Sequence, residues 1–235
     1  GKASGQGAAG TLAVTLGGST SVGTETINAT TPLYFPNGQR VLTVTQEKQL
    51  LAANNTPGSN VSNLIDTSSA TQPLTNATGV GQISAAQISA GGFDNVQLRV
   101  DNVDSASTTS MIAFQTGVNL VVPSTLTLDA TAFSGGATLN AAQVSLQNIG
   151  GTNLTASNIT AGNTPFTVNA NFIDVIGNVA VNNVSSLHLN SATDIRLRGP
   201  ATSLNANGAL IAPETIAMDA AQVYPSTGTS FSISP

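Results

Sequence analysis

The residues best suited to chemistry are three aspartates that lie close together in the chain. Asp94, Asp101 and Asp104 surround Arg99. Carboxylates on one face can hold Ca²⁺ while a basic neighbour accepts a proton, as a polysaccharide-degrading enzyme requires. Asp101 and Asp104 flank a predicted turn, however, where carboxylates are normally solvated. We therefore predict no catalytic, cofactor-binding or metal-binding residue, with a Ca²⁺ site as the alternative.

His188 is the only histidine. It lies between Leu187 and Leu189, so the alternation of a strand directs it outward if the leucines point inward. A histidine without a positioned carboxylate or serine is a poor catalytic group. We predict a structural or surface role for it.

Arg196 and Arg198 alternate with apolar residues and therefore share one strand face with Asp194. We expect these three residues to form a small charge ladder that keeps the face solvated, with a contact to an anionic glycan as the alternative. Tyr34 and Phe35 form a second candidate, because their rings can pack on the protein or stack on sugars. The candidate ligand contacts are thus Tyr34, Phe35, Arg196 and Arg198.

Apolar-x-apolar segments recur along the chain and predict short strands. These strands would position the candidate side chains. Such segments begin at Leu126, Val144, Phe166 and Leu187. Strands that recur about every twenty residues and are joined by Asn, Gly, Ser and Asp are typical of coils in a β-solenoid. Inward apolar residues would stack from coil to coil, and Asn residues could form hydrogen-bonded ladders.

The repeat is interrupted between residues 32 and 78, which contain four prolines. We expect residues 1–31 to form the first coils and 32–78 to project as an insertion, with a hairpin and a short helix near 46–53. Residues 79–235 are expected to form the regular shaft, in which coiling resumes over Gln82 to Phe93. Projecting loops commonly carry binding residues, so Tyr34 and Phe35 lie in the part best placed for recognition.

Composition excludes several classes of protein. Charged residues make up 7% of the chain, against roughly 25% in ordinary globular proteins. The net charge is −5, so no basic surface attracts nucleic acid. The chain has no cysteine, which excludes disulfides and thiol nucleophiles. No apolar run is long enough to span a bilayer.

Four segments of the chain carry a family resemblance. The first is AGGFDNVQLR, from Ala90 to Arg99. It is followed by LTLDA at 126–130, AAQVSL at 141–146 and AQVYPSTGTSFSI at 221–233. Together these segments, which lie within about residues 80–235, resemble filamentous haemagglutinin-family exoproteins, and the Gln-Val-Tyr-Pro element at 222–225 is the most specific. The Asn-Pro-Asn-type motif of the family's secretion domain has no match here, so the resemblance concerns the shaft.

The resemblance implies a passenger of two-partner secretion, exported through an outer-membrane transporter of a Gram-negative bacterium. The recurring strands and the interruption at 32–78 lead us to expect an all-β, right-handed parallel β-helix with one extra-helical insertion. Its expected role is a structural or adhesive shaft segment of a secreted surface fibre, mediating attachment, biofilm formation or cell–cell contact. The alternatives are a β-helical polysaccharide-degrading enzyme and a self-assembling extracellular filament. Expected partners are the transporter, surface glycans or other cells, and further copies of the chain.

Overall fold

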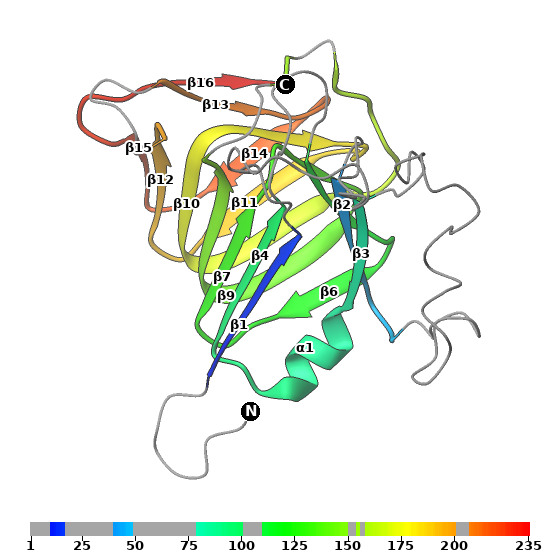
Figure 1. Ribbon diagram of the computed structural model, residues 1–235. Coiled ribbons are helices and arrows are strands. Elements are labelled where there is room, and N and C mark those ends of the chain that lie inside the picture. Colours follow the sequence, from blue (N-terminus) through cyan, green and yellow to red (C-terminus); the bar gives the residue numbers. More distant parts are fainter. Residues whose placement is uncertain are drawn as a thin grey trace, which may run out of the picture.

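Parallel strands surrounding one apolar core make up most of the described protein. The computed structural model describes residues 10–16, 40–48, 79–100, 110–149, 154–155, 158–200 and 207–235. Within these ranges all pairings between strands are parallel. The strands wrap around the core in a nearly closed, barrel-like arrangement (Figure 1). The predicted all-β, parallel class is confirmed at this level.

The strands form three rows, and within a row each strand pairs with the next. Row A contains β1 (Thr11–Leu16), β4 (Asn95–Val100), β7 (Thr125–Asp129), the second half of β9 (Ala137–Asn148), the middle of β10 (Phe166–Asn182), β12 (Asp194–Arg198) and β15 (Gln222–Pro225). Row B contains β3 (Gly79–Ser84), β2 (Arg40–Thr45), β5 (Met111–Phe114), β8 (Ala132–Ser134), the end of β10, β13 (Asn207–Ile211) and β16 (Ser230–Ser234). Row C contains β6 (Val118–Val121), the first half of β9, the start of β10, β11 (Leu187–Ser191) and β14 (Ile216–Asp219).

Alternation along each strand supplies the core. In row A the residues in register are Leu98, Leu128, Leu146 and Val175, and all four are fully buried. Burying each such side chain contributes roughly 1.5–3 kcal/mol. The apolar residues therefore form a continuous stack through successive strands.

Three phenylalanines join rows B and C across the core. The ring centroid of Phe166 lies 5.4 Å from that of Phe114 in an edge-to-face contact and 6.5 Å from that of Phe133 in a stacked one. Edge-to-face and offset contacts suit the charge distribution of aromatic rings. They tie strands from two rows into one core.

The predicted ladder of apolar segments is correct for two of its three steps. Leu126 is in register with Val144, the next segment in the ladder, and Phe166 is in register with Leu187. Val144, however, pairs with Ile173 in row A, whereas Phe166 begins the part of β10 that belongs to row C. The predicted step from Val144 to Phe166 therefore joined two different rows.

Part of the segment expected to project lies in the sheet. Arg40–Thr45 form β2, which pairs with β3 on one side and β5 on the other. Leu42 and Val44 on this strand are buried in the core. Gln46 and Glu47 form a bend, so the helix expected near 46–53 does not begin there. Residues 32–39 and 49–78 lie outside the described residues.

A helix replaces part of the coil predicted over Gln82 to Phe93. After β3, α1 (Ala85–Gly91) begins at Ser84, whose Oγ accepts a hydrogen bond from the backbone N–H of Gln87 (3.2 Å). It ends at Gly92, which adopts a left-handed conformation. Ser and Gly at these positions are ordinary helix start and stop residues. The predicted coil is therefore wrong for Ala85–Gly91.

Helix α1 lies beside β6, the first strand of row C (Figure 1). Ser89 Oγ donates to the backbone carbonyl of Val121 (3.1 Å), and Gln46 Oε1 accepts from the backbone N–H of Asn119 (2.7 Å). These two side chains occupy backbone groups on the edge of β6 that pairs with no other described strand. The helix thus covers this end of row C and fixes the position of β6.

Gly177 and Gly117 have similar φ angles but different surroundings, so substitutions at the two positions can test how closely neighbouring strands approach. Gly177 in β10 has a φ of 80°, and a Cβ there would overlap the carbonyl oxygen of Asn148 in β9. Gly117 has a φ of 84°, but nothing lies within 4 Å of the place a Cβ would occupy. A side chain would therefore strain the backbone at both positions, but only at Gly177 would it also overlap a neighbouring strand.

Gly177→Ala is expected to lower the free energy of unfolding by about 3 kcal/mol or more, because strain and overlap act together. Gly117→Ala is the matched control and should cost only about 1 kcal/mol, from the left-handed backbone alone. Urea denaturation monitored by circular dichroism measures both changes. Equal losses in the two variants would contradict the close approach of β9 and β10 at Gly177.

Candidate functional site

The four predicted ligand contacts are only partly placed by the structure. Tyr34 and Phe35 lie outside the described residues, as do Asp101 and Asp104. Arg196 and Arg198 lie on the outward face of β12, alternating with buried Ile195 and Leu197 as predicted. The structure therefore allows one predicted contact surface to be built in detail.

The ion-pair partner of both arginines is Asp174 on β10, not the expected Asp194 on their own strand. Arg196 Nε donates to Asp174 Oδ1 at 2.8 Å, and Arg196 Nη2 donates to Asp174 Oδ2. Arg198 Nη1 lies 3.6 Å from Asp174 Oδ2. Asp174 and Arg196 are direct register partners in row A. The predicted group of opposite charges exists, but its acidic member lies on the neighbouring strand and not on the strand of the arginines.

Aromatic side chains extend this arginine cluster, which we define as Phe172, Asp174, Arg196, Arg198 and Tyr224. The guanidinium carbon of Arg196 lies 5.1 Å from the ring centroid of Phe172, within the range of a cation–π contact. Tyr224 follows Arg196 in register on β15. The hydrogen bonds that Arg196 donates to Asp174 raise the pKa of Arg196 above its usual value, with a smaller Coulombic contribution from the same carboxylate.

The cluster can offer an exposed cation without performing acid–base chemistry. The Asp174 side chain is 5% exposed, whereas those of Arg196 and Arg198 are 35% and 34% exposed. An arginine remains protonated throughout the physiological pH range, and the raised pKa of Arg196 strengthens that condition. Asp174 therefore orients Arg196, and the outer parts of both guanidinium groups remain accessible.

His188 does have a nearby serine, contrary to expectation. Its Nε2 lies 2.9 Å from Ser186 Oγ, two residues earlier in the chain. Both side chains are partly buried, and among the described residues no carboxylate pairs with the imidazole to orient it, as an activated serine requires. The pair is a local polar contact on the outward side of row C.

The described carboxylates do not gather into a metal or acid–base site. Asp129 lies 3.7 Å from Arg99 and accepts from the backbone N–H of Ile149 (3.3 Å), while Asp174 pairs with Arg196. Across the described ranges, no three His, Cys, Asp or Glu side chains lie close enough together to hold a metal ion. Each of these two aspartates is instead used in a separate ion pair.

A ladder of asparagine side chains crosses row C. Asn140, Asn169 and Asn190 are direct register partners on β9, β10 and β11. Asn169 Nδ2 donates to Asn140 Oδ1 (3.0 Å), and Asn190 Nδ2 donates to Asn169 Oδ1 (2.9 Å). Asn140 Nδ2 also donates to Asn119 Oδ1 (2.8 Å), which lies diagonally on β6. The predicted stacking of Asn residues is thereby confirmed, although the sequence alone does not single out these members.

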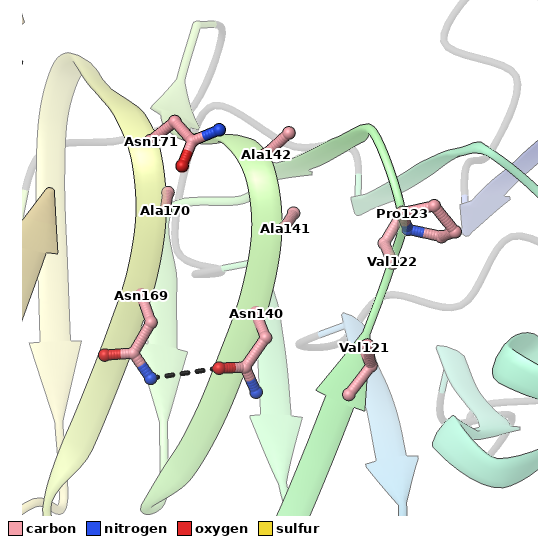
Figure 2. Close-up of a pocket in the computed structure, with 9 residues that line it drawn as sticks. All are labelled: Val121, Val122, Pro123, Asn140, Ala141, Ala142, Asn169, Ala170 and Asn171. Atoms are coloured by element: carbon pink, nitrogen blue, oxygen red, sulfur yellow. Dashed lines mark hydrogen bonds between the residues drawn. The ribbon is translucent and has the colours of Figure 1, made fainter. Parts of the chain in front are cut away.

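An open hollow of about 550 Å³ lies beside this ladder (Figure 2). It has uncharged walls, and its floor contains small side chains where β9 and β10 pass from row C to row A. Asn140 and Asn169 lie toward one end and Asn171 toward the other. The residues that line the hollow are Val121, Val122, Pro123, Asn140, Ala141, Ala142, Asn169, Ala170 and Asn171.

Comparisons with known proteins identify no relative. No protein-family model matches the chain, and the searches of curated proteins and of solved structures also returned no match. Within the described ranges, no helix combines the length and the apolar character needed to cross a membrane. The functional assignment therefore depends on the chain's own residues.

Breaking the Asp174–Arg196 pair from its two sides should have unequal effects. Arg196→Met leaves a nearly buried carboxylate with only the more distant Arg198, so we expect a loss of about 2–3 kcal/mol. Asp174→Asn leaves an arginine that can still reach water, so the expected loss is smaller, about 1 kcal/mol. Thermal and urea unfolding of both variants checks this order.

Arg198→Met provides a control, because Arg198 lies farther from Asp174 and should contribute little to stability. If Arg196→Met were no more destabilising than Arg198→Met, the orienting role of the bidentate pair would be refuted. The double variant Asp174→Asn with Arg196→Met should be close to the Asp174→Asn variant, since it leaves no buried charge without its partner.

The asparagine ladder yields a second test of stability. Asn169→Ala removes two ladder hydrogen bonds from a partly buried position, and we expect a loss of about 1–2 kcal/mol. Asn119→Ala removes one bond from the exposed end, so it should cost about 0.5 kcal/mol. A loss at Asn119 as large as that at Asn169 would indicate that the ladder itself is not the stabilising unit. Chemical denaturation of both variants measures the difference.

Proposed function

We propose that this chain is a shaft segment of a secreted bacterial surface fibre, folded as a right-handed parallel β-helix. The observation that supports the fold most directly is the order in which the chain visits the rows. It passes through rows C, A and B in the same order in β6–β7–β8, within β10, in β11–β12–β13 and in β14–β15–β16. Parallel crossovers are almost always right-handed, which favours that hand.

A shaft role follows from what this architecture does well. Each strand is held by its row neighbours, so length can increase without the larger core that a globular domain would need. The asparagine ladder presents amide groups on successive strands of row C, and the Asp174–Arg196 pair presents an oriented cation on row A. Repeated weak contacts gain strength when many act together, as attachment, biofilm formation or cell–cell contact requires.

The arginine cluster is the proposed contact with anionic surface glycans. Arg196 is oriented by Asp174 and lies against Phe172, so a rigid cation stands beside an aromatic ring. Guanidinium groups bind carboxylates and sulfates through paired hydrogen bonds, and aromatic rings pack on the apolar faces of sugars. Tyr34 and Phe35, which lie outside the described residues, remain proposed contacts with a sugar ligand.

Secretion through a two-partner outer-membrane transporter is part of the same proposal. It is supported by the resemblance of the Ala90 to Arg99 segment and of the Gln-Val-Tyr-Pro element to filamentous haemagglutinin-family exoproteins. The absence of cysteine is compatible with passage through the periplasm without cross-links. The location that follows is the cell surface or exterior of a Gram-negative bacterium.

Beads coated with the purified chain are expected to attach to bacterial or epithelial cells more strongly than beads coated with a protein of similar size and charge. Arg196→Ala together with Arg198→Ala should reduce attachment by roughly threefold to tenfold, and added salt should weaken it, because exposed charge contacts are screened. Adhesion counts under flow provide the measurement. Attachment no better than the control protein would refute the adhesive role.

The two alternatives predict different results with the same preparation. A polysaccharide-degrading enzyme would release new reducing ends from an acidic polysaccharide. A self-assembling filament would show a sedimentation coefficient that rises with protein concentration. We expect no polymer cleavage and a constant sedimentation coefficient, and either opposite result would favour the corresponding alternative.

A further inference from the structure

The hollow beside the asparagine ladder differs from the arginine cluster in both shape and chemistry. None of its nine lining residues is charged, and it combines amide groups with apolar walls. Its volume of about 550 Å³ lies within the range of roughly 300–1,000 Å³ typical of small-ligand sites. This volume can hold a short stretch of a longer molecule.

The amides along one side have hydrogen-bonding capacity left for a ligand. An asparagine side chain has two N–H donors and an oxygen with two acceptor positions. In the ladder, Asn140 and Asn169 each use one donor and one acceptor position on their neighbours. One donor and one acceptor position on each therefore remain, repeated at the strand spacing of about 4.8 Å.

Asn171 adds a further amide at the other end of the hollow. Its backbone carbonyl accepts hydrogen bonds from Ser191 Oγ (2.8 Å), Thr193 Oγ1 and the backbone N–H of Thr193 (2.9 Å). Its side chain is exposed and makes no hydrogen bond to the described parts of the chain. The backbone is thus fixed while the amide group stays available.

The opposite wall is apolar and is also held in place. Val121 is 46% exposed, and Pro123 is exposed beside it. The backbone N–H of Val122 donates to the carbonyl of Asn140 (2.9 Å), and Ser89 of α1 binds the carbonyl of Val121. Both walls are therefore formed before any ligand arrives, which reduces the entropic cost of binding.

These features favour a sugar chain over a peptide. A peptide that binds a sheet by strand addition needs an unpaired strand edge, but β9 and β10 are paired on both sides in row C. A sugar chain has hydroxyl groups that match amides and C–H faces that pack on apolar side chains. The uncharged lining disfavours an anionic polymer, because nothing in the hollow compensates for the loss of its hydration.

We propose that this hollow binds a segment of an uncharged polysaccharide. Hydroxyl groups of the sugar chain bind the free amide positions of Asn140, Asn169 and Asn171, and its C–H faces pack on Val121 and Pro123. Ala142 and its small neighbours leave room for the sugar rings. This inference rests on the adhesive role proposed above and deepens it, because it adds a second ligand class at a surface separate from the arginine cluster.

The test measures binding of the purified chain to soluble β-glucan, mannan and galactan, with alginate and heparin as anionic comparisons. We expect at least one uncharged polymer to bind with an affinity that salt hardly changes. Ala142→Trp fills the hollow and should weaken this binding by at least about tenfold. Asn171→Ala removes an exposed amide without affecting the core and should weaken it by roughly threefold to tenfold.

Ala13→Trp is the matched control, since Ala13 is exposed on the outer face of β1 and does not line the hollow. It should leave binding unchanged, and circular dichroism should show that all variants are folded. Binding that persists in folded Ala142→Trp and Asn171→Ala, or no binding to any uncharged polymer, would overturn the inference. Binding to the anionic polymers alone would also overturn the inference and would indicate that the arginine cluster is the glycan-binding surface.

Cell attachment distinguishes this failure from failure of the adhesive role. If coated beads attach to cells but Ala142→Trp does not change uncharged-polymer binding, the hollow is refuted while adhesion stands. If uncharged polymers bind through the hollow but coated beads do not attach to cells, the adhesive role is refuted while the binding site stands.

Discussion

Parallel pairing of each strand with its row neighbours determines where most described side chains lie. Backbone N–H and carbonyl groups inside the protein require partners, and the strands before and after in the row provide them. In register, each side chain then faces its equivalent about 4.8 Å away. Leu98, Leu128 and Leu146 consequently stack inside, as Asn140 and Asn169 do outside. The same backbone constraint therefore organises both the core and the surface.

The low charge content follows from this constraint. Equal charges in register would repel each other at every step along a row. Where two charged residues are direct register partners on described strands, their signs are opposite, as for Asp174 with Arg196 and for Arg99 with Asp129. Amides avoid the difficulty, since each one can donate to the next and accept from the previous one. A chain with 7% charged residues and ladders of Asn is thus compatible with long parallel rows.

The sequence predicts the strands better than it predicts their partners. Alternation identifies the inward residues of β7, β9 and β11 because it is a local property of the chain. Register depends on the length of chain between strands, and nothing local shows that Val144 pairs with Ile173 instead of with Phe166. For the same reason the sequence did not reveal Asp174 as the partner of Arg196. The sequence likewise predicted regular coiling over Gln82 to Phe93, whereas Ser84 and Gly92 begin and end a helix there.

The hollow illustrates how a surface feature can arise from the way a strand changes rows. Strands β9 and β10 continue from row C into row A without a loop, and the residues at the change are Ala141, Ala142, Ala170 and Asn171. Three of these side chains are small, so the bend leaves space outside the core. Because the core residues on either side point inward, substitutions at the bend can reshape this space while the stack in each row stays intact. Ligand preference at such a bend can therefore change independently of the fold.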